Sequence, residues 1–166
     1  MALLRSATLV VSTISTGLMA GIFSVYANAI MPGLHRTDDR TFVGAFQAID
    51  TAIINPLFLA TFLAPVVSTG AGALLHLGED EGSVLPWCAA AFGLYSFVVV
   101  STLAVNVPRN DAIKAAGDPD RIPDLVAVRR RFGERTWARW NVARAVASTA
   151  AFSCVVWALV EHGRAT

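Results

Sequence analysis

Charge is scarce in this chain of 166 residues. Asp, Glu, Lys and Arg make up 15% of it, while 55% of the residues are hydrophobic and the mean hydropathy is +0.57. Soluble domains carry about 25% charged residues, so the missing charge indicates that much of the surface faces a lipid bilayer. The net charge of +1 gives no sign of a nucleic-acid partner. The length fits a single domain over residues 1–166.

Residues that bind cofactors or form covalent bonds are scarce as well. The sequence contains no P-loop, no dinucleotide-binding glycine pattern and no Cys-x-x-Cys pair. Cys88 and Cys154 each lie inside an apolar run, which excludes a disulfide framework and favours two buried apolar side chains. His35, His76 and His162 are scattered, so we assign no metal ligands. We favour no cofactor, and a haem or a metal ion is left open.

Long uncharged runs are what the sequence does have. A bilayer core of about 30 Å is crossed by about 20 apolar residues in a helix. Such runs predict four spans at about residues 7–30, 53–76, 84–106 and 141–160. We therefore predict an all-α fold, an integral membrane four-helix bundle. The first run is longer than the apolar core of a signal peptide, which has about 7–15 residues, so we expect it to be retained.

Two glycines on the first span favour close helix packing. Gly17 and Gly21 are four residues apart, a spacing that lets another helix approach closely. The pattern is compatible with packing inside the bundle and with a homo-oligomer through Gly17 and Gly21.

The connections between the spans differ strongly in positive charge. Eleven of the thirteen Lys and Arg residues lie between the first and second spans or between the third and fourth, if Arg144 at the edge of the fourth span is counted, and the other two are Arg5 and Arg164. Cytoplasmic loops of membrane proteins carry the excess of Lys and Arg. We therefore predict a multi-pass protein of the cell membrane, with both long loops in the cytoplasm and both termini outside it.

The first long loop is predicted to contain a short amphipathic helix. Pro32 and Gly33 are expected to end the first membrane helix and turn the chain. Asp38 or Asp39 can then cap a helix that lies on the membrane surface or re-enters it. The apolar face of this helix consists of Phe42, Phe46, Ile49 and Ile53.

The second long loop begins with another predicted helix break. Pro108 cannot donate a backbone hydrogen bond, and Asn106 and Asn110 are suited to satisfy the freed carbonyls. From Asp124 a basic helix is predicted to run through Phe132 and into the fourth span without interruption.

One face of that helix gathers large and polar side chains. At spacings of i, i+3, i+4 and i+7 lie Trp137, Trp140, Asn141 and Arg144. A deep Arg144 costs up to about 3 kcal/mol, so we expect it to face the bundle or a water-filled pocket. Its expected partner is Asp50, Glu134 or a substrate anion. The alternative is an interfacial arginine that reaches lipid phosphates, with the tryptophans in the aromatic belt of the membrane.

Four short motifs stand in order along the chain, namely Met31-Pro32-Gly33-Leu34, Asn55-Pro56, Asn106-Val107-Pro108-Arg109-Asn110 and Trp137-x-x-Trp140-Asn141-x-x-Arg144. In this layout, over roughly residues 15–160, the chain resembles the anthrone oxygenase-like family of small membrane proteins. The resemblance implies a four-span protein, some of whose relatives help to oxidise anthrones to anthraquinones in polyketide pathways. It favours an oxidoreductase and does not name the substrate.

A cofactor-free oxygenation is consistent with this resemblance. The anion of an anthrone reacts with dioxygen directly, so the protein needs an apolar slot, a base, and donors for the developing oxyanion. We predict Asp50 or His35 as the base and Arg144 as the cationic donor. The predicted contacts to a small hydrophobic substrate are donors at Asn106, Asn110 and Asn141 and stacking rings at Trp137 and Trp140.

Two other functions stay open from the sequence. A non-enzymatic membrane protein would bind a lipid, a small hydrophobic ligand or a partner subunit, and its arginines and tryptophans would hold headgroups. A transporter subunit fits less well. Apart from Arg144, the spans lack the midmembrane charges that proton-coupled carriers use.

Overall fold

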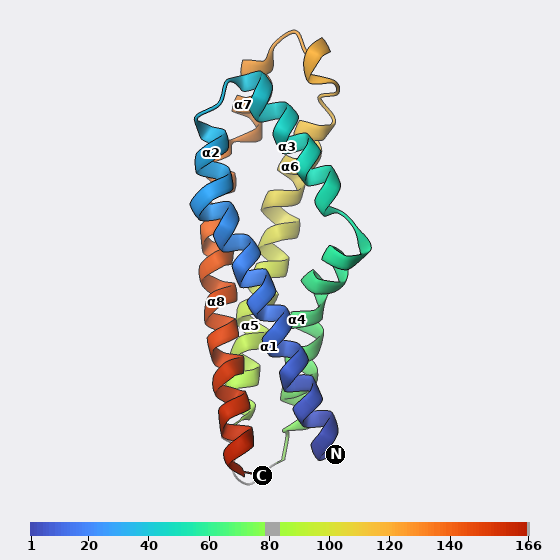
Figure 1. Ribbon diagram of the computed structural model, residues 1–166, viewed down its shortest axis with the longest axis vertical. Coiled ribbons are helices and arrows are strands. Elements are labelled where there is room, and N and C mark those ends of the chain that lie inside the picture. The colour runs from blue at the N-terminus through green and yellow to red at the C-terminus, as the bar shows by residue number, and fades with distance from the viewer. Residues whose placement is uncertain (79–83, 166) are drawn as a thin grey trace.

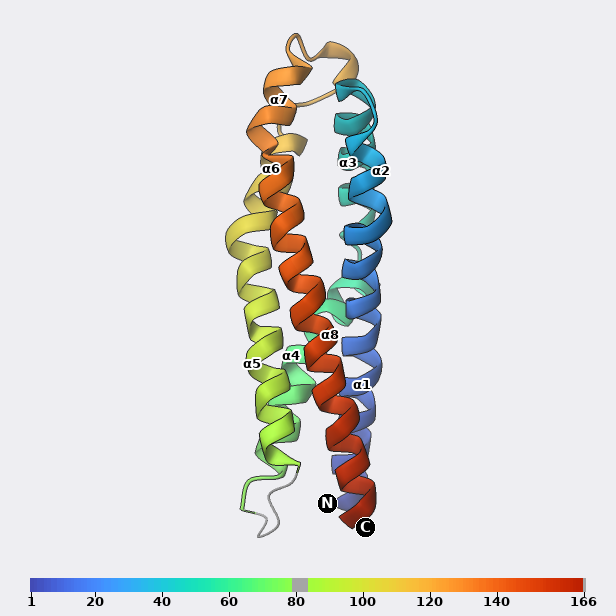
Figure 2. The same cartoon turned by 90° about the vertical axis from the view of Figure 1, so that its left-hand side faces the viewer.

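The computed structural model describes residues 1–78 and 84–165, and within these ranges every regular element is a helix. Four long helices form an elongated bundle with both termini at one end (Figures 1 and 2). Shorter helices cover the opposite end, which we call the loop end. The long helices are α1 (Ala2–Val25), α4 (Pro56–Leu75), α5 (Leu85–Ser101) and α8 (Glu134–Ala165). The shorter ones are α2 (Met31–His35), α3 (Asp39–Ile53), α6 (Val107–Lys114) and α7 (Leu125–Phe132), with a 3-10 turn at Pro119–Arg121.

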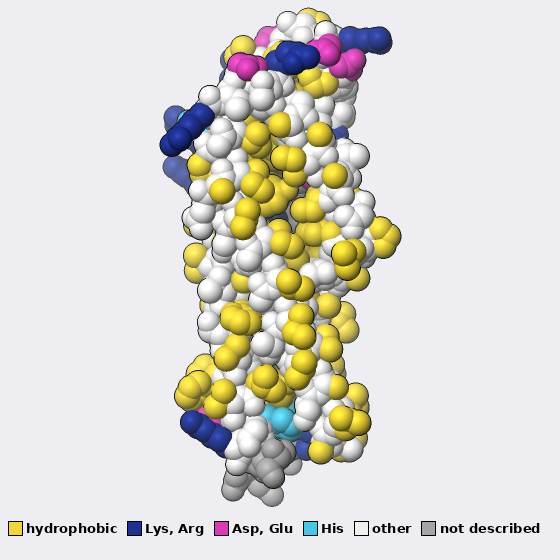
Figure 3. Space-filling model, in the orientation of Figure 1, with side chains coloured by type: hydrophobic (Ala, Val, Ile, Leu, Met, Phe, Trp, Pro, Cys, Tyr) yellow, Lys and Arg dark blue, Asp and Glu magenta, His cyan; other side chains and the backbone are white. Residues whose placement is uncertain are grey.

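Four helical segments are long and apolar enough to cross a membrane, which confirms the predicted all-α membrane bundle. On the face shown in Figure 3, charged side chains gather at the two ends of the molecule and hydrophobic side chains lie between them. Helix α8 has 32 residues, which makes it about 48 Å long. Because a hydrocarbon core is about 30 Å thick, we place the loop end beyond the hydrocarbon.

Two prolines that were expected to break helices follow wide turns instead. The π turns Tyr26–Ile30 and Thr102–Asn106 precede Pro32 and Pro108, and the N–H after each turn donates to the carbonyl five residues back. Each proline then lies in the first turn of the next α-helical segment, where a missing N–H costs little. The predicted helix ends at Pro32-Gly33 and at Pro108 are therefore wrong, because the chain stays helical beyond both.

The predicted short helix α3 is present at the loop end. Asp38 caps it, and its carboxylate accepts the Thr41 backbone N–H at 2.9 Å and the Thr41 hydroxyl at 2.8 Å. These hydrogen bonds hold the pKa of Asp38 below its usual value. From this cap α3 runs back along the bundle toward the start of α4 (Figure 1).

The apolar face of α3 completes a cluster of rings at the loop end. Phe42 contacts Phe132 of α7, and Phe46 contacts both Phe132 and Trp137 of α8. The ring centroids lie from 4.6 Å apart, for Phe46 and Phe132, to 6.3 Å apart, for Phe132 and Trp137. We call these four residues the aromatic cap. The cap is buried, and it ties the helices of the two long loops to the bundle.

The basic helix α7 does not continue into α8. Gly133 has φ +69° and ψ +54°, a left-handed conformation that glycine adopts without a steric penalty. Its N–H donates to the carbonyls of Arg129 and Arg130, which is a glycine C-cap. The predicted uninterrupted helix is therefore wrong. The turn at Gly133 brings Glu134 to 3.0 Å from the Arg129 guanidinium.

We expect Gly133→Ala to lower the free energy of unfolding by about 1–2 kcal/mol, because the left-handed conformation costs a non-glycine residue that much. The added methyl group would lie 3.8 Å from the nearest side-chain atom, so a steric clash contributes little. Reversible unfolding in detergent micelles, followed by circular dichroism, measures the effect. Gly93→Ala is the matched control, since a side chain at this helical glycine meets nothing within 4 Å. Equal stability of the two variants would contradict the explanation.

Candidate functional site

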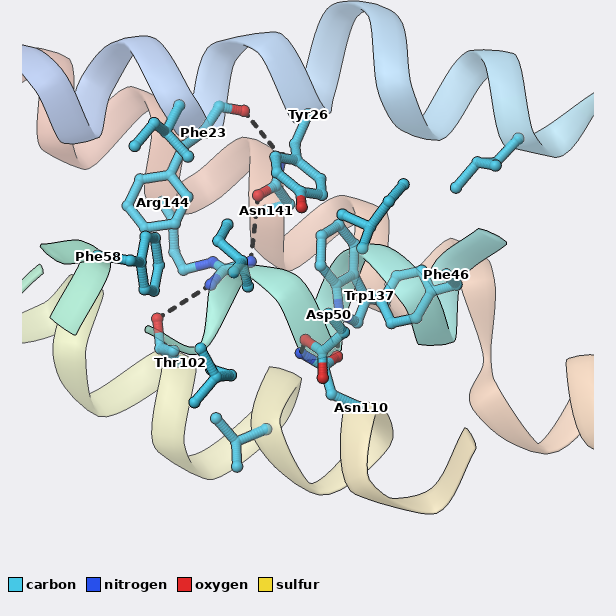
Figure 4. A pocket seen from close by; sticks show the side chains of 16 residues that line it. Phe23, Tyr26, Phe46, Asp50, Phe58, Thr102, Asn110, Trp137, Asn141 and Arg144 are labelled. Atoms are coloured by element: carbon cyan, nitrogen blue, oxygen red, sulfur yellow. Dashed lines mark hydrogen bonds between the residues drawn. The ribbon is translucent and has the colours of Figure 1, made fainter. Parts of the chain in front are cut away.

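A cavity lies inside the bundle, directly below the aromatic cap. It encloses about 630 Å³ of space between atoms, its open mouth included. Aromatic and branched aliphatic side chains form most of its wall. The polar residues that line it are Tyr26, Asp50, Thr102, Asn110, Asn141 and Arg144 (Figure 4).

Arg144 of α8 is the most deeply buried cation of the described chain, with 4% of its surface exposed. Nη1 donates to Thr102 Oγ1 at 3.0 Å and Nη2 to Asn141 Oδ1 at 3.1 Å. The guanidinium carbon lies 4.7 Å from the centroid of the Phe23 ring and 5.4 Å from that of Trp137, in range of cation–π attraction. Its Nε has no hydrogen-bond partner in the described part of the chain.

Neither carboxylate expected to pair with Arg144 does so. Glu134 binds Arg129 at 3.0 Å and His35 at 2.7 Å at the loop end, and Asp50 pairs with Lys114. Among residues 1–78 and 84–165 no carboxylate lies within ion-pair distance of Arg144. Of the three predicted partners, only an anion from outside the chain is left.

Two buried asparagines hold Arg144 in place. Asn141, 1% exposed, donates from Nδ2 to the Phe23 carbonyl at 3.0 Å while its oxygen accepts from Arg144. Asn106, also 1% exposed, lies behind the guanidinium. With its amide oxygen toward the donors, as the hydrogen-bond network requires, Asn106 accepts from Arg144 Nη2 at 3.1 Å and from Trp137 Nε1 at 3.3 Å. Asn106 therefore contacts the cation without lining the cavity.

Asp50 of α3 enters the cavity from a different side. Its Oδ1 accepts a hydrogen bond from Asn110 Nδ2 at 2.6 Å, and the Asn110 oxygen accepts from Trp137 Nε1 at 2.7 Å. Lys114 Nζ lies 2.8 Å from Asp50 Oδ2. The Asp50 side chain is 8% exposed and that of Lys114 is 32% exposed. The chain of contacts thus links a carboxylate in the cavity to the aqueous surface.

Three of these residues were not among the sequence candidates, namely Tyr26, Thr102 and Lys114. Tyr26 extends from the π turn after α1 into the cavity, and its ring centroid lies 5.9 Å from that of Trp137 (Figure 4). An isolated tyrosine at the end of an apolar run gave no signal of this role. Lys114 did carry a signal, because it follows Asn110 by four residues and so shares its helix face.

Two sequence candidates lie away from the cavity. His35 is exposed at the loop end, where its Nδ1 is 2.7 Å from Glu134 Oε1. Trp140 is half-buried and packs against Phe97, with ring centroids 6.2 Å apart. In the described ranges no three His, Cys, Asp or Glu side chains cluster closely enough to hold a metal ion. The candidates that the structure brings together are Asp50, Asn110, Trp137, Asn141 and Arg144, with Asn106 behind them.

Comparison with known proteins gives one match. The family model described as anthrone oxygenase matches residues 42–154, which is more than half of the chain. These residues include every polar residue of the cavity wall except Tyr26. No curated protein and no solved structure matches the chain.

An arginine whose role is to bind a ligand is not expected to stabilise the folded protein. We expect Arg144→Met to change the free energy of unfolding by less than about 1 kcal/mol, because an apolar side chain removes a buried charge that has no counter-ion. Arg129→Met is the control, because Arg129 is bound to Asp39 and Glu134, each at 3.0 Å. It should lose about 2–3 kcal/mol. Unfolding in detergent compares the two variants, and equal losses would show that Arg144 is a structural residue.

Proposed function

The chain belongs to the anthrone oxygenase family, and from this premise we propose that it is a membrane-embedded oxygenase that oxidises an anthrone-type aromatic ketone in the Arg144 cavity. The observation that carries the proposal is the buried Arg144, which has no carboxylate partner among the described residues, beside an apolar cavity that also holds Asp50. The excess of Lys and Arg at the loop end supports a cytoplasmic position for this end.

The proposed reaction balances with dioxygen alone. Loss of a proton from the methylene carbon of the anthrone leaves an anion whose charge rests mainly on the carbonyl oxygen. The anion reduces dioxygen and forms a carbon–oxygen bond, which gives a hydroperoxide on that carbon. Loss of the second methylene proton then forms the new carbonyl as the oxygen–oxygen bond breaks. One anthrone and one dioxygen become one anthraquinone and one water, so we propose no cofactor.

Arg144 is suited to stabilise the anion in this scheme. The charge develops on an oxygen in a site that excludes most water, where a fixed cation acts more strongly than in solution. Asn141 and Thr102 hold two guanidinium nitrogens at 3.0–3.1 Å, so the cation does not have to reorganise as the proton leaves. The rings of Phe23 and Trp137 line the same cavity and give an aromatic substrate an apolar surface.

Asp50 is the proposed base. Asn110 donates to one carboxylate oxygen and is itself fixed by Trp137, so the carboxylate has a defined orientation. A proton that moves from the substrate carbon to Asp50 can leave through Lys114, 2.8 Å away and partly exposed. Lys114 gives a proton to water as it accepts the one from Asp50. His35, bound to Glu134 outside the cavity, is left out of the proposal.

We expect Arg144→Met and Asp50→Asn each to lower kcat/KM for anthrone about 100-fold. Arg144→Met removes the cation that stabilises the developing anion, and Asp50→Asn removes the base that accepts the proton. Asn141→Ala should cost about tenfold through misplacement of Arg144. The assay uses the purified protein in lipid nanodiscs and follows oxygen uptake and quinone absorbance.

Trp140→Phe is the control for this assay, since Trp140 contacts Phe97 outside the cavity, and its turnover should equal that of the wild type. A wild-type protein that binds anthrone and does not oxidise it would instead support a non-enzymatic protein that holds a lipophilic ligand. Normal turnover in Arg144→Met would remove Arg144 from the mechanism.

A further inference from the structure

A second hollow runs along the membrane-facing side of the molecule, between α1 and α4. Its wall is mostly apolar, and the small residues Gly17 and Gly21 line it on the α1 side. Figure 3 shows a recess with hydrophobic side chains around it on this face. We call this hollow the α1–α4 groove.

The break between α3 and α4 creates the groove. Helix α3 ends at Ile53, and α4 begins at Pro56, where the Asn55 side chain caps it by accepting the Phe58 N–H at 2.9 Å. The chain bends outward at this break, away from α1 (Figure 1). No continuous helix therefore covers this side of α1.

The two glycines of α1 have different surroundings. A Cβ at Gly17 would lie 3.0 Å from the ring of Phe152 in α8, so Gly17 allows a close contact within the chain. A Cβ at Gly21 would meet nothing within 4 Å. Gly21 therefore leaves space in the groove, whereas the predicted homo-oligomer through Gly17 and Gly21 stays a prediction.

The α1–α4 groove adjoins the Arg144 cavity. Ile22, Tyr26, Ile53 and Phe58 line both. Two other directions are obstructed. The aromatic cap covers the cavity at the loop end, and farther into the bundle Tyr95 is fully buried and donates to the Phe62 carbonyl at 3.0 Å. The ion pair between Asp50 and Lys114 fills the remaining space on that side. Protons can pass along this contact, but a larger molecule cannot.

We infer that the α1–α4 groove is a lateral entrance through which a flat, uncharged, lipophilic molecule passes from the bilayer into the Arg144 cavity. Ile22, Ile53 and Phe58 form the threshold between groove and cavity. That this molecule is an anthrone rests on the proposed function, whereas the entrance itself rests on the shape and polarity of the groove. An anion or a strongly hydrated molecule is excluded, because the wall offers it no charge partner.

Cysteine labelling tests the entrance without any turnover. Ile49 lines the cavity and not the groove, so Ile49→Cys in a Cys88→Ala, Cys154→Ala background reports on access to the cavity. The probes are a naphthyl maleimide dissolved in the nanodisc lipid and a sulfonated thiosulfonate in the water. Gly21→Phe fills the groove, and Gly93→Phe places the same side chain on α5, where nothing lies within 4 Å.

We expect Gly21→Phe to slow labelling by the naphthyl maleimide roughly tenfold or more, with Gly93→Phe unchanged. The sulfonated reagent should react slowly in every variant. Equal maleimide rates with and without Gly21→Phe would overturn the inference, and so would fast labelling by the sulfonated reagent. If Gly21→Phe does not fold, Gly21→Leu fills part of the groove and should slow labelling to a smaller extent.

Anthrone oxidation by the same variants separates the two proposals. Gly21→Phe should lower kcat/KM while Gly93→Phe keeps the wild-type value. If labelling shows the lateral route but the wild type does not oxidise anthrone, the proposed function fails and the entrance stands. If the wild type oxidises anthrone but filling the groove changes neither labelling nor kcat/KM, the entrance fails and the proposed function stands.

Discussion

Burying the charge of Arg144 is the constraint on which the rest of this structure depends. A guanidinium in an apolar bundle loses its hydration, and the loss is large unless hydrogen bonds and charges replace the water. Here the replacements are neutral: a hydroxyl from Thr102, amides from Asn141 and Asn106, and the face of Phe23. These groups fix the orientation of the guanidinium, but none of them carries a negative charge that would balance it. Such an arrangement favours an anion that is not part of the chain.

The contrast with Arg129 shows what a structural arginine looks like in the same chain. Arg129 contacts two carboxylates, and it also donates to the backbone carbonyls of His35 and Thr37. This satisfied cluster holds the loop end together, outside the cavity. The separation keeps Glu134 away from Arg144, while Lys114 holds the charge of Asp50. Each anionic group near the cavity thus has its own cation, and Arg144 is left for a ligand.

Much of the bundle and part of the site could be predicted from the sequence, because both depend on local patterns. Hydropathy alone locates the spans, and the helical period puts Trp137, Asn141 and Arg144 on one face. The same period cannot tell Trp137, which lines the cavity, from Trp140, which packs against Phe97. The prediction that the two prolines end their helices was wrong, because a π turn precedes each proline and shifts the helical hydrogen-bond register. Each proline therefore lies in the first turn of the next helical segment. The pairing of Asp50 with Lys114 joins two helices through residues 64 positions apart in the sequence, which no local pattern encodes.

A lateral entrance and a buried cation make sense together if charge appears only after entry. A neutral ketone partitions into the bilayer and crosses an apolar threshold without losing hydration. Inside, in the proposed mechanism, removal of a proton by Asp50 would make it an anion next to Arg144, and the same apolar threshold would then oppose its escape. Oxidation to a neutral quinone removes the charge again, so attraction to Arg144 ends and the product can return to the lipid. The asymmetry between an apolar path and a charged interior would therefore retain the reactive species and release the finished one.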